Sequence, residues 1–223
     1  VNKKTLTLGL IIPDITNPFY PEIARGVEFA AQKAGYSVFL CNTNWEKKRE
    51  LQYLELLAEK RVDGIIIAPI AKKTGNMRAL LGDYPVVIVG SSTRTGESSY
   101  VTIDNVRGGY LATEFLIKKK RTPVGFIGAS EDSHTLEERL QGYKNALEAY
   151  GLEVDEKYIR FGDFKRETGA KIIKAMIREG IRPKGIFGEN DLLAIGIMQG
   201  AAEMGLRIPD DLAVVGFDDI PLA

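Results

Sequence analysis

Short, almost continuous hydrophobic runs recur along the chain, and they narrow the possible folds more than any other feature. Runs such as GLII, GIII and VVIV have the composition of strands covered on both faces, which is typical of a parallel sheet between helical layers. The predicted strands are Leu6–Ile12, Ser37–Cys41, Gly64–Ala68, Val86–Val89, Val101–Ile103, Pro123–Ile127, Gly185–Gly188 and Leu212–Gly216.

Amphipathic segments separate these runs. Ile23, Val27, Ala30 and Ala34 recur three or four residues apart, and Gly35 is a plausible helix stop. The same periodicity returns in five later segments, 51–58, 111–116, 140–147, 172–177 and 193–204. Strand–helix–strand repetition predicts a doubly wound α/β architecture.

The alternation is interrupted once, by the turn-rich segment SSTRTGESS between Val86–Val89 and Val101–Ile103. That segment is too short for a crossover helix, and the strand–helix alternation then starts again. We therefore expect two Rossmann-like lobes, residues 1–102 and 103–223. No Gly/Ser-rich linker separates them, so short rigid strands are expected to join them.

Charge and cysteine content limit the partners. The 223 residues carry 30 basic and 30 acidic side chains, so the formal net charge is zero, whereas DNA-binding surfaces usually carry a basic surplus. The chain alone is therefore expected to bind DNA poorly. Cys41 is the sole cysteine, which excludes an intramolecular disulfide and fits a cytoplasmic protein. No apolar run approaches the roughly 18 residues of a membrane span, and no signal peptide is visible.

Catalytic and metal-binding motifs are missing from the sequence. His134 is the sole histidine and is interpreted as a surface or pocket-rim residue, and no HExxH or CxxC pair occurs. There is no G-x-S-x-G elbow and no phosphate-binding P-loop, and the first strand is followed by PDITNP where a dinucleotide fold would show G-x-G-x-x-G. We therefore expect neither an enzyme nor a cofactor, and NAD and ATP are not expected as ligands.

Carboxylates cluster after two predicted strands, in Glu189-Asn190-Asp191 and in Asp218-Asp219. The carboxyl ends of strands are where open α/β sheets bind ligands. Asp191 also stands directly before a helical pattern, so a helix cap and a ligand contact are both open to it. Asp218 has a turn residue as its alternative interpretation.

The chain resembles the effector domain of the lactose-repressor (LacI/GalR) family over essentially its whole length. The resemblance rests on LGLIIPDITNPFYPEIARGVE, KRELQYLELLAEKRVDGIIIAP, VTIDNVRGGYLATEFLI, ERLQGYKNALEAYGL, GDFKRETGAK and PKGIFGENDLLAIGIMQGAAEMGLRIPDDLAVVGFDDIPLA, in the order usual for the family. It implies a periplasmic-binding-protein-like fold that holds a small molecule between two lobes.

Matching motifs imply the ligand-binding residues. They are Phe19, Tyr20, Arg139, Phe164 and Asp191, with weaker matches at Asn17, Ser91 and Asp218. These residue types suit a sugar, because aromatic rings cover its C–H faces while Asp, Asn and Arg bind its hydroxyls. Phe19 could instead belong to the core, and Arg139 could be a solvated charge on its helix.

The resemblance also implies the biological role. We expect a cytoplasmic effector sensor of a transcriptional repressor, binding a sugar or sugar phosphate rather than a purine. Operator DNA would bind through a helix-turn-helix head that the chain lacks, and the resemblance also implies a C-terminal segment, returning to the first lobe, that we do not find in the sequence. A homodimer is expected through the helix carrying Leu51, Leu54 and Leu57. The alternatives are a periplasmic sugar-binding protein of a transporter and a sugar- or nucleotide-processing enzyme.

Overall fold

A computed structural model describes residues 4–70, 80–82, 84–90, 99–129 and 133–223. The chain forms two compact units, Val1–Ile103 and Asp104–Ala223, which are called unit 1 and unit 2 below. Both are α/β structures built on a parallel sheet, as the hydrophobic runs predict. The predicted fold class is therefore confirmed.

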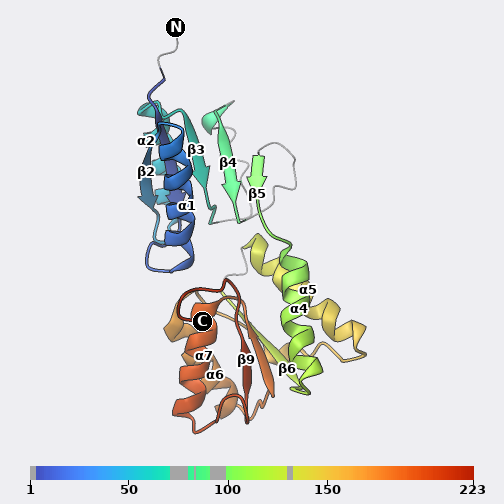
Figure 1. The fold of residues 1–223 in the computed structure, drawn as a ribbon. Helices are drawn as coiled ribbons and strands as arrows, with labels where there is room; N and C mark the ends of the chain where they lie inside the picture. Colours follow the sequence, from blue (N-terminus) through green and yellow to red (C-terminus); the bar gives the residue numbers. More distant parts are fainter. Residues whose placement is uncertain (1–3, 71–79, 83, 91–98, 130–132) are drawn as a thin grey trace. The chain divides into compact units, whose positions relative to one another are not determined.

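Unit 1 carries a five-stranded parallel sheet with the order β2-β1-β3-β4-β5 (Figure 1). Its elements are β1 (Thr7–Ile12), α1 (Phe19–Lys33), β2 (Ser37–Asn42), α2 (Lys47–Glu59), β3 (Gly64–Ile67), β4 (Val86–Val89) and β5 (Ser99–Val101). One sheet face packs on Leu54 and Leu57 of α2, and Ile11, Ile65 and Ile88 supply the sheet side of that core. Leu54 and Leu57 are thus core residues, whereas Leu51 of the same helix is exposed.

Unit 2 carries a four-stranded parallel sheet with the order β7-β6-β8-β9. Its elements are α4 (Asn105–Lys118), β6 (Val124–Gly128), α5 (His134–Ala149), η1 (Glu156–Tyr158), β7 (Ile159–Phe161), α6 (Arg166–Arg178), β8 (Gly185–Gly188), α7 (Asp191–Glu203) and β9 (Ala213–Val215). The strand order reverses between β6 and β8. Such a switch point opens a crevice at the carboxyl ends of the two strands.

Two helical layers cover the sheet of unit 2. Phe126 of β6 and Phe187 of β8 are register partners and pack on the face covered by α4 and α5. Ile127 and Ile186 alternate with them along the strands and pack on the face covered by α6 and α7. Both faces are therefore buried, which explains why these strands are hydrophobic without a period of two.

Helices α4 and α5 cross at glycines. A Cβ added to Gly142 of α5 would lie 2.6 Å from the backbone nitrogen of Tyr110 and closer still to the carbonyl oxygen of Val106. A Cβ on Gly109 of α4 would lie 2.9 Å from the Cα of Arg139. Because backbone meets backbone here, the middle of α5 packs closely against the first half of α4.

Two strands differ from the sequence-based expectation. The strand predicted at Val101–Ile103 is observed as β5 at Ser99–Val101, because its pairing with Val87–Val89 of β4 ends at Val101. Strand β7 was not predicted, since its three residues, Ile159, Arg160 and Phe161, place a charge between two apolar side chains. Both are edge strands, where polar residues are tolerated and the hydrophobic signal is weak.

Candidate functional site

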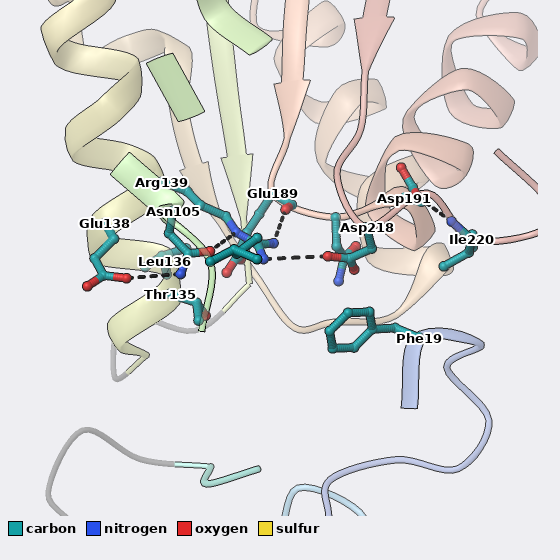
Figure 2. A network of polar contacts seen from close by, with 12 residues as sticks. Phe19, Asn105, Thr135, Leu136, Glu138, Arg139, Glu189, Asp191, Asp218 and Ile220 are labelled. Carbon is teal, nitrogen blue, oxygen red and sulfur yellow. Dashed lines mark hydrogen bonds and ion pairs between the residues drawn. The ribbon is translucent and has the colours of Figure 1, made fainter. Parts of the chain in front are cut away.

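A buried arginine lies at the carboxyl edge of the unit 2 sheet, beside the switch point. Arg139 is in the second turn of α5 and is only 8% exposed, so its interpretation as a solvated charge is wrong. Its Nε donates to Asn105 Oδ1 at 3.0 Å, and its Nη1 donates to the backbone oxygen of Glu189 at 2.6 Å (Figure 2). The guanidinium thus connects α5 to the start of α4 and to the end of β8.

Asp218 forms the third polar contact of the arginine. Arg139 Nη2 lies 3.5 Å from Asp218 Oδ1, and both side chains are less than a tenth exposed. The Phe217 ring covers one face of the guanidinium, with its centroid 3.7 Å from Cζ. Asp218 and Asp219 both have positive φ, at 109° and 56°, which is unusual for residues other than glycine. Such backbone strain is often found where a side chain is aimed for function.

Burial perturbs the carboxyl groups of this cluster. It raises the pKa of Asp218 to about 7, because desolvation outweighs the attraction of Arg139 and because Asp191 and Glu189 repel its charge. It raises the pKa of Glu189 to about 6, with Arg139 and the N–H of Ala129 acting in the opposite direction. The pKa of Asp191 is also raised by burial. Arg139 attracts the carboxyl groups of Asp218 and Glu189, and the carboxyl group of Asp191 lies close enough to repel that of Asp218.

Glu189 connects the ends of the two strands at the switch point. Its side chain leaves the end of β8, and its Oε2 accepts a hydrogen bond from the N–H of Ala129, just beyond the end of β6, at 2.6 Å. The two strands that border the crevice are therefore joined by a buried side chain as well as by the sheet. Its backbone oxygen accepts from Arg139, so one residue anchors both the crevice and the guanidinium.

The helix-cap interpretation of Asp191 is wrong. The cap of α7 is Asn190, whose Oδ1 accepts from the N–H of Leu193 at 2.8 Å, and Asp191 is the first helical residue. Asp191 instead holds the segment after β9: its Oδ2 accepts from the N–H of Ile220 at 3.0 Å (Figure 2). Its own N–H donates to the oxygen of Phe217. Asp191 thereby fixes the chain on both sides of Asp218.

The matched residues of unit 1 gather at the start of α1. Asn17 is buried, and its Oδ1 accepts from the N–H of Phe19 at 3.2 Å, so its amide orders the first turn. Phe19 is half-buried and packs edge-on to Tyr20, with ring centroids 5.2 Å apart. Tyr20 in turn packs edge-on to Trp45 at 6.1 Å, an aromatic residue that the sequence did not single out. Ser91 lies outside the described residues.

Two further residues singled out in the sequence, Phe164 and His134, contact other side chains of unit 2. Phe164 of unit 2 is half-buried and packs against the core under α6 and α7. His134 begins α5, with its Nδ1 3.8 Å from Glu137 Oε2. Within the described part of the chain, no group of three His, Cys, Asp or Glu side chains is arranged to hold a metal. None of the helices described is both long and apolar enough to cross a membrane.

Comparison with known proteins shows the family of the chain. Residues 5–222 match the family model of periplasmic binding proteins and the sugar-binding domain of the LacI family. The ribose operon repressor of Escherichia coli K12 is 35% identical over 99% of this chain and 67% of its own length. The chain belongs to the LacI family. It is an effector-binding domain that spans about two thirds of the length of that repressor.

Solved structures agree with the family assignment. A ribose operon repressor structure from Burkholderia thailandensis has a TM-score of 0.86 and 34% identity, covering 98% of this chain and 82% of its own. The complex of the transcriptional regulator CelR with cellobiose has a TM-score of 0.88 and 28% identity, covering all of this chain and 70% of its own. These relatives are transcriptional regulators, which favours a regulator over the transporter alternative.

Proposed function

We propose that this LacI-family domain binds an uncharged sugar through the cluster around Arg139, and that binding controls a DNA-binding head in the full-length regulator. The observation that carries the proposal is the buried guanidinium at the switch point of the unit 2 sheet. Burying a guanidinium removes its hydration, and the contacts that replace this hydration often add little to the stability of the fold. A charge kept in such a place therefore favours a role in binding. Ligand recognition at a crevice of this kind is the purpose that the fold supports best.

The charge of the cluster supports an uncharged ligand. Asp191, Glu189 and Asp218 offer three carboxyl groups against the single guanidinium of Arg139, and the pKa of each carboxyl is raised. A phosphate brought among them would meet acidic groups that are already costly to ionise. Sugar hydroxyls instead donate to carboxylates and accept from a guanidinium without adding charge. The complex of CelR with cellobiose is consistent with an uncharged sugar.

The other matched residues enter the proposal as further ligand contacts. Aromatic rings at Phe19, Tyr20 and Phe164 would cover the C–H faces of the sugar, and Asn17 and Asp191 would contribute polar edges. The structure gives Asn17 and Asp191 hydrogen bonds to their own backbone surroundings, so they would bind ligand with orientations that are already fixed. Such preorganisation lowers the entropic cost of binding.

Regulation requires that the sugar bind two states of the protein with different affinities. We propose that the full-length regulator works in the cytoplasm as a homodimer, without catalysis, and that operator DNA is bound by the head. Exposed Leu51 on α2 would contribute to the dimer surface, whereas Leu54 and Leu57 are committed to the core.

A ligand panel tests the proposal. Thermal unfolding of the chain would be followed with D-ribose, D-glucose, cellobiose, D-ribose 5-phosphate and hypoxanthine. A sugar present at about 100 times its Kd should add about 2.7 kcal/mol to the free energy of unfolding. We expect an uncharged sugar to give the largest shift. A shift from D-ribose 5-phosphate or hypoxanthine that exceeds every uncharged sugar would overturn the proposed ligand class.

A further inference from the structure

The two shortest contacts of the Arg139 guanidinium are with uncharged oxygens. Nε donates to the side-chain amide of Asn105 at 3.0 Å, and Nη1 donates to the backbone carbonyl of Glu189 at 2.6 Å. The charged neighbour, Asp218, is farther away at 3.5 Å. Two neutral acceptors thus fix the orientation of the guanidinium without neutralising it. The donors of Nη2 are used by neither of these acceptors, and they lie on the side where Asp218 is found.

Asn105 is itself held in one orientation. It is the first residue of α4 and is 1% exposed, and its Nδ2 donates to Glu138 Oε2 at 3.0 Å. Because the amide nitrogen faces a carboxylate, the amide oxygen must face Arg139 (Figure 2). Glu138 precedes Arg139 in α5. Two hydrogen bonds therefore connect the three side chains in sequence, from Glu138 on α5 through Asn105 on α4 to Arg139 on α5.

The same face of α4 also packs against the backbone of Arg139 and against the Phe217 ring, which covers the guanidinium. Gly109 leaves room for the backbone of Arg139, since a Cβ there would lie 2.9 Å from the Arg139 Cα. Gly108 leaves room for the Phe217 ring, since its Cβ would lie 2.5 Å from Phe217 Cε2. Asn105, Gly108 and Gly109 are three and four residues apart, so they share one face of the helix.

We infer that Asn105 is a positioning residue of the ligand site, which fixes the Arg139 guanidinium so that its Nη2 side is presented to the ligand. The inference rests on the proposed function, in which Arg139 contacts the sugar. It assigns to the start of α4 a role beyond covering the sheet.

NMR spectroscopy tests the orientation of the Arg139 guanidinium without any ligand. The Nε–Hε signal of Arg139, identified in the chain by its loss in Arg139→Lys, should be sharp and protected from exchange because Asn105 accepts its hydrogen bond. Asn105→Ala should move and broaden this signal. Asn145→Ala is a matched control on the adjoining helix, because Asn145 bonds to Gln141 and not to Arg139.

An exchange of groups separates positioning from a general loss of structure. Asn105→Asp combined with Glu138→Gln swaps the amide and the carboxylate, so an oxygen still faces Arg139 while an amide can still bridge the helices. The protected Nε–Hε signal should return in this double variant. Loss of the signal in both the alanine variant and the double variant would overturn the inference, as would its persistence in Asn105→Ala.

Calorimetry with D-ribose completes the test. Asn105→Ala should weaken the Kd by up to about tenfold, because a guanidinium that is no longer held in place must be ordered when the sugar binds, and Asn145→Ala should leave the Kd unchanged. Equal Kd values in the parent and Asn105→Ala would overturn the inference. If D-ribose fails to bind the parent, the same comparison is made with D-glucose and cellobiose; if none of the three binds, the proposed ligand class fails, and the Nε–Hε signal still decides whether Asn105 orients Arg139.

Discussion

Replacement of Gly109 by alanine tests whether the crossing of α4 and α5 is as close as described. The added Cβ would lie 2.9 Å from both the Cα and the carbonyl carbon of Arg139, and closer still to its carbonyl oxygen, whereas ordinary contacts begin at 3.4 Å. These atoms belong to the backbone of α5, so no side-chain rotation relieves the overlap. The helices must move apart, and the cavity opened between them adds to the cost.

The expected magnitude follows from two opposing effects. Overpacking of this kind costs about 1–3 kcal/mol and occasionally more, whereas alanine gains about 0.5–1 kcal/mol over glycine inside a helix. Because the overlap is with backbone, we expect Gly109→Ala to lose about 2 kcal/mol of unfolding free energy, or roughly 8 °C in Tm for a unit of this size. Gly26→Ala is the matched control, since Gly26 is exposed in α1 with nothing within 4 Å. It should gain about 0.5–1 kcal/mol.

Two probes assign each change to its unit. Circular dichroism follows the helices of both units, whereas fluorescence follows unit 1 alone, because Trp45 is the single tryptophan in the sequence. Gly109→Ala should lower the Tm seen by circular dichroism, and Gly26→Ala should raise the Tm seen by fluorescence. A Gly109→Ala variant as stable as the parent would show that the helices do not meet at this distance.

Three further expectations follow from the same structure. Burial raises the pKa of Asp218 to about 7, above its ordinary value of 3.8, so the folded state binds more protons than the unfolded state between these values. Unfolding free energy should therefore fall as pH rises from about 4 to 7, by up to about 4 kcal/mol, and Asp218→Asn should flatten that slope in urea unfolding; a flat profile in the parent would contradict this. Asn190→Ala should cost about 0.5–2 kcal/mol in thermal unfolding because it removes the α7 cap, and a smaller loss would deny Asn190 that role. Leu51→Arg should disrupt the proposed homodimer, so that light scattering reports a monomer whose Tm equals that of the dissociated parent; a Leu51→Arg variant that is still dimeric would place the interface elsewhere.

The sequence predicted the fold because its strands are buried on both faces. Runs such as GIII at Gly64–Ile67 need no tertiary information to be recognised. Strand β7 was missed because the charge of Arg160 interrupts so short a run. A helix cap was one of two interpretations that the sequence left open for Asp191, because Asp and Asn both favour that position and only the extended backbone of Asn190 distinguishes the two residues.

The candidate site was predicted only in part. The family resemblance implied Arg139, and more weakly Asp218, as ligand-binding residues, but helix periodicity could not show that Arg139 is buried. Its burial depends on the close approach of α4, which becomes possible through glycines in a different helix. Asn105 was missed for a similar reason: it follows a real helix cap, Asp104, and in sequence nothing marks it as the partner of a residue 34 positions away.

The central claim is that the guanidinium of Arg139 binds an uncharged sugar. Calorimetry with the uncharged sugar that gives the largest thermal shift tests it most directly, on the parent, Arg139→Lys and the matched control Arg178→Lys, whose exposed side chain lies on α6. Lysine keeps the charge but cannot reproduce the geometry of the guanidinium. We expect Arg139→Lys to bind about tenfold more weakly or worse, and Arg178→Lys to match the parent. Equal Kd values for all three proteins would show that the sugar binds without Arg139.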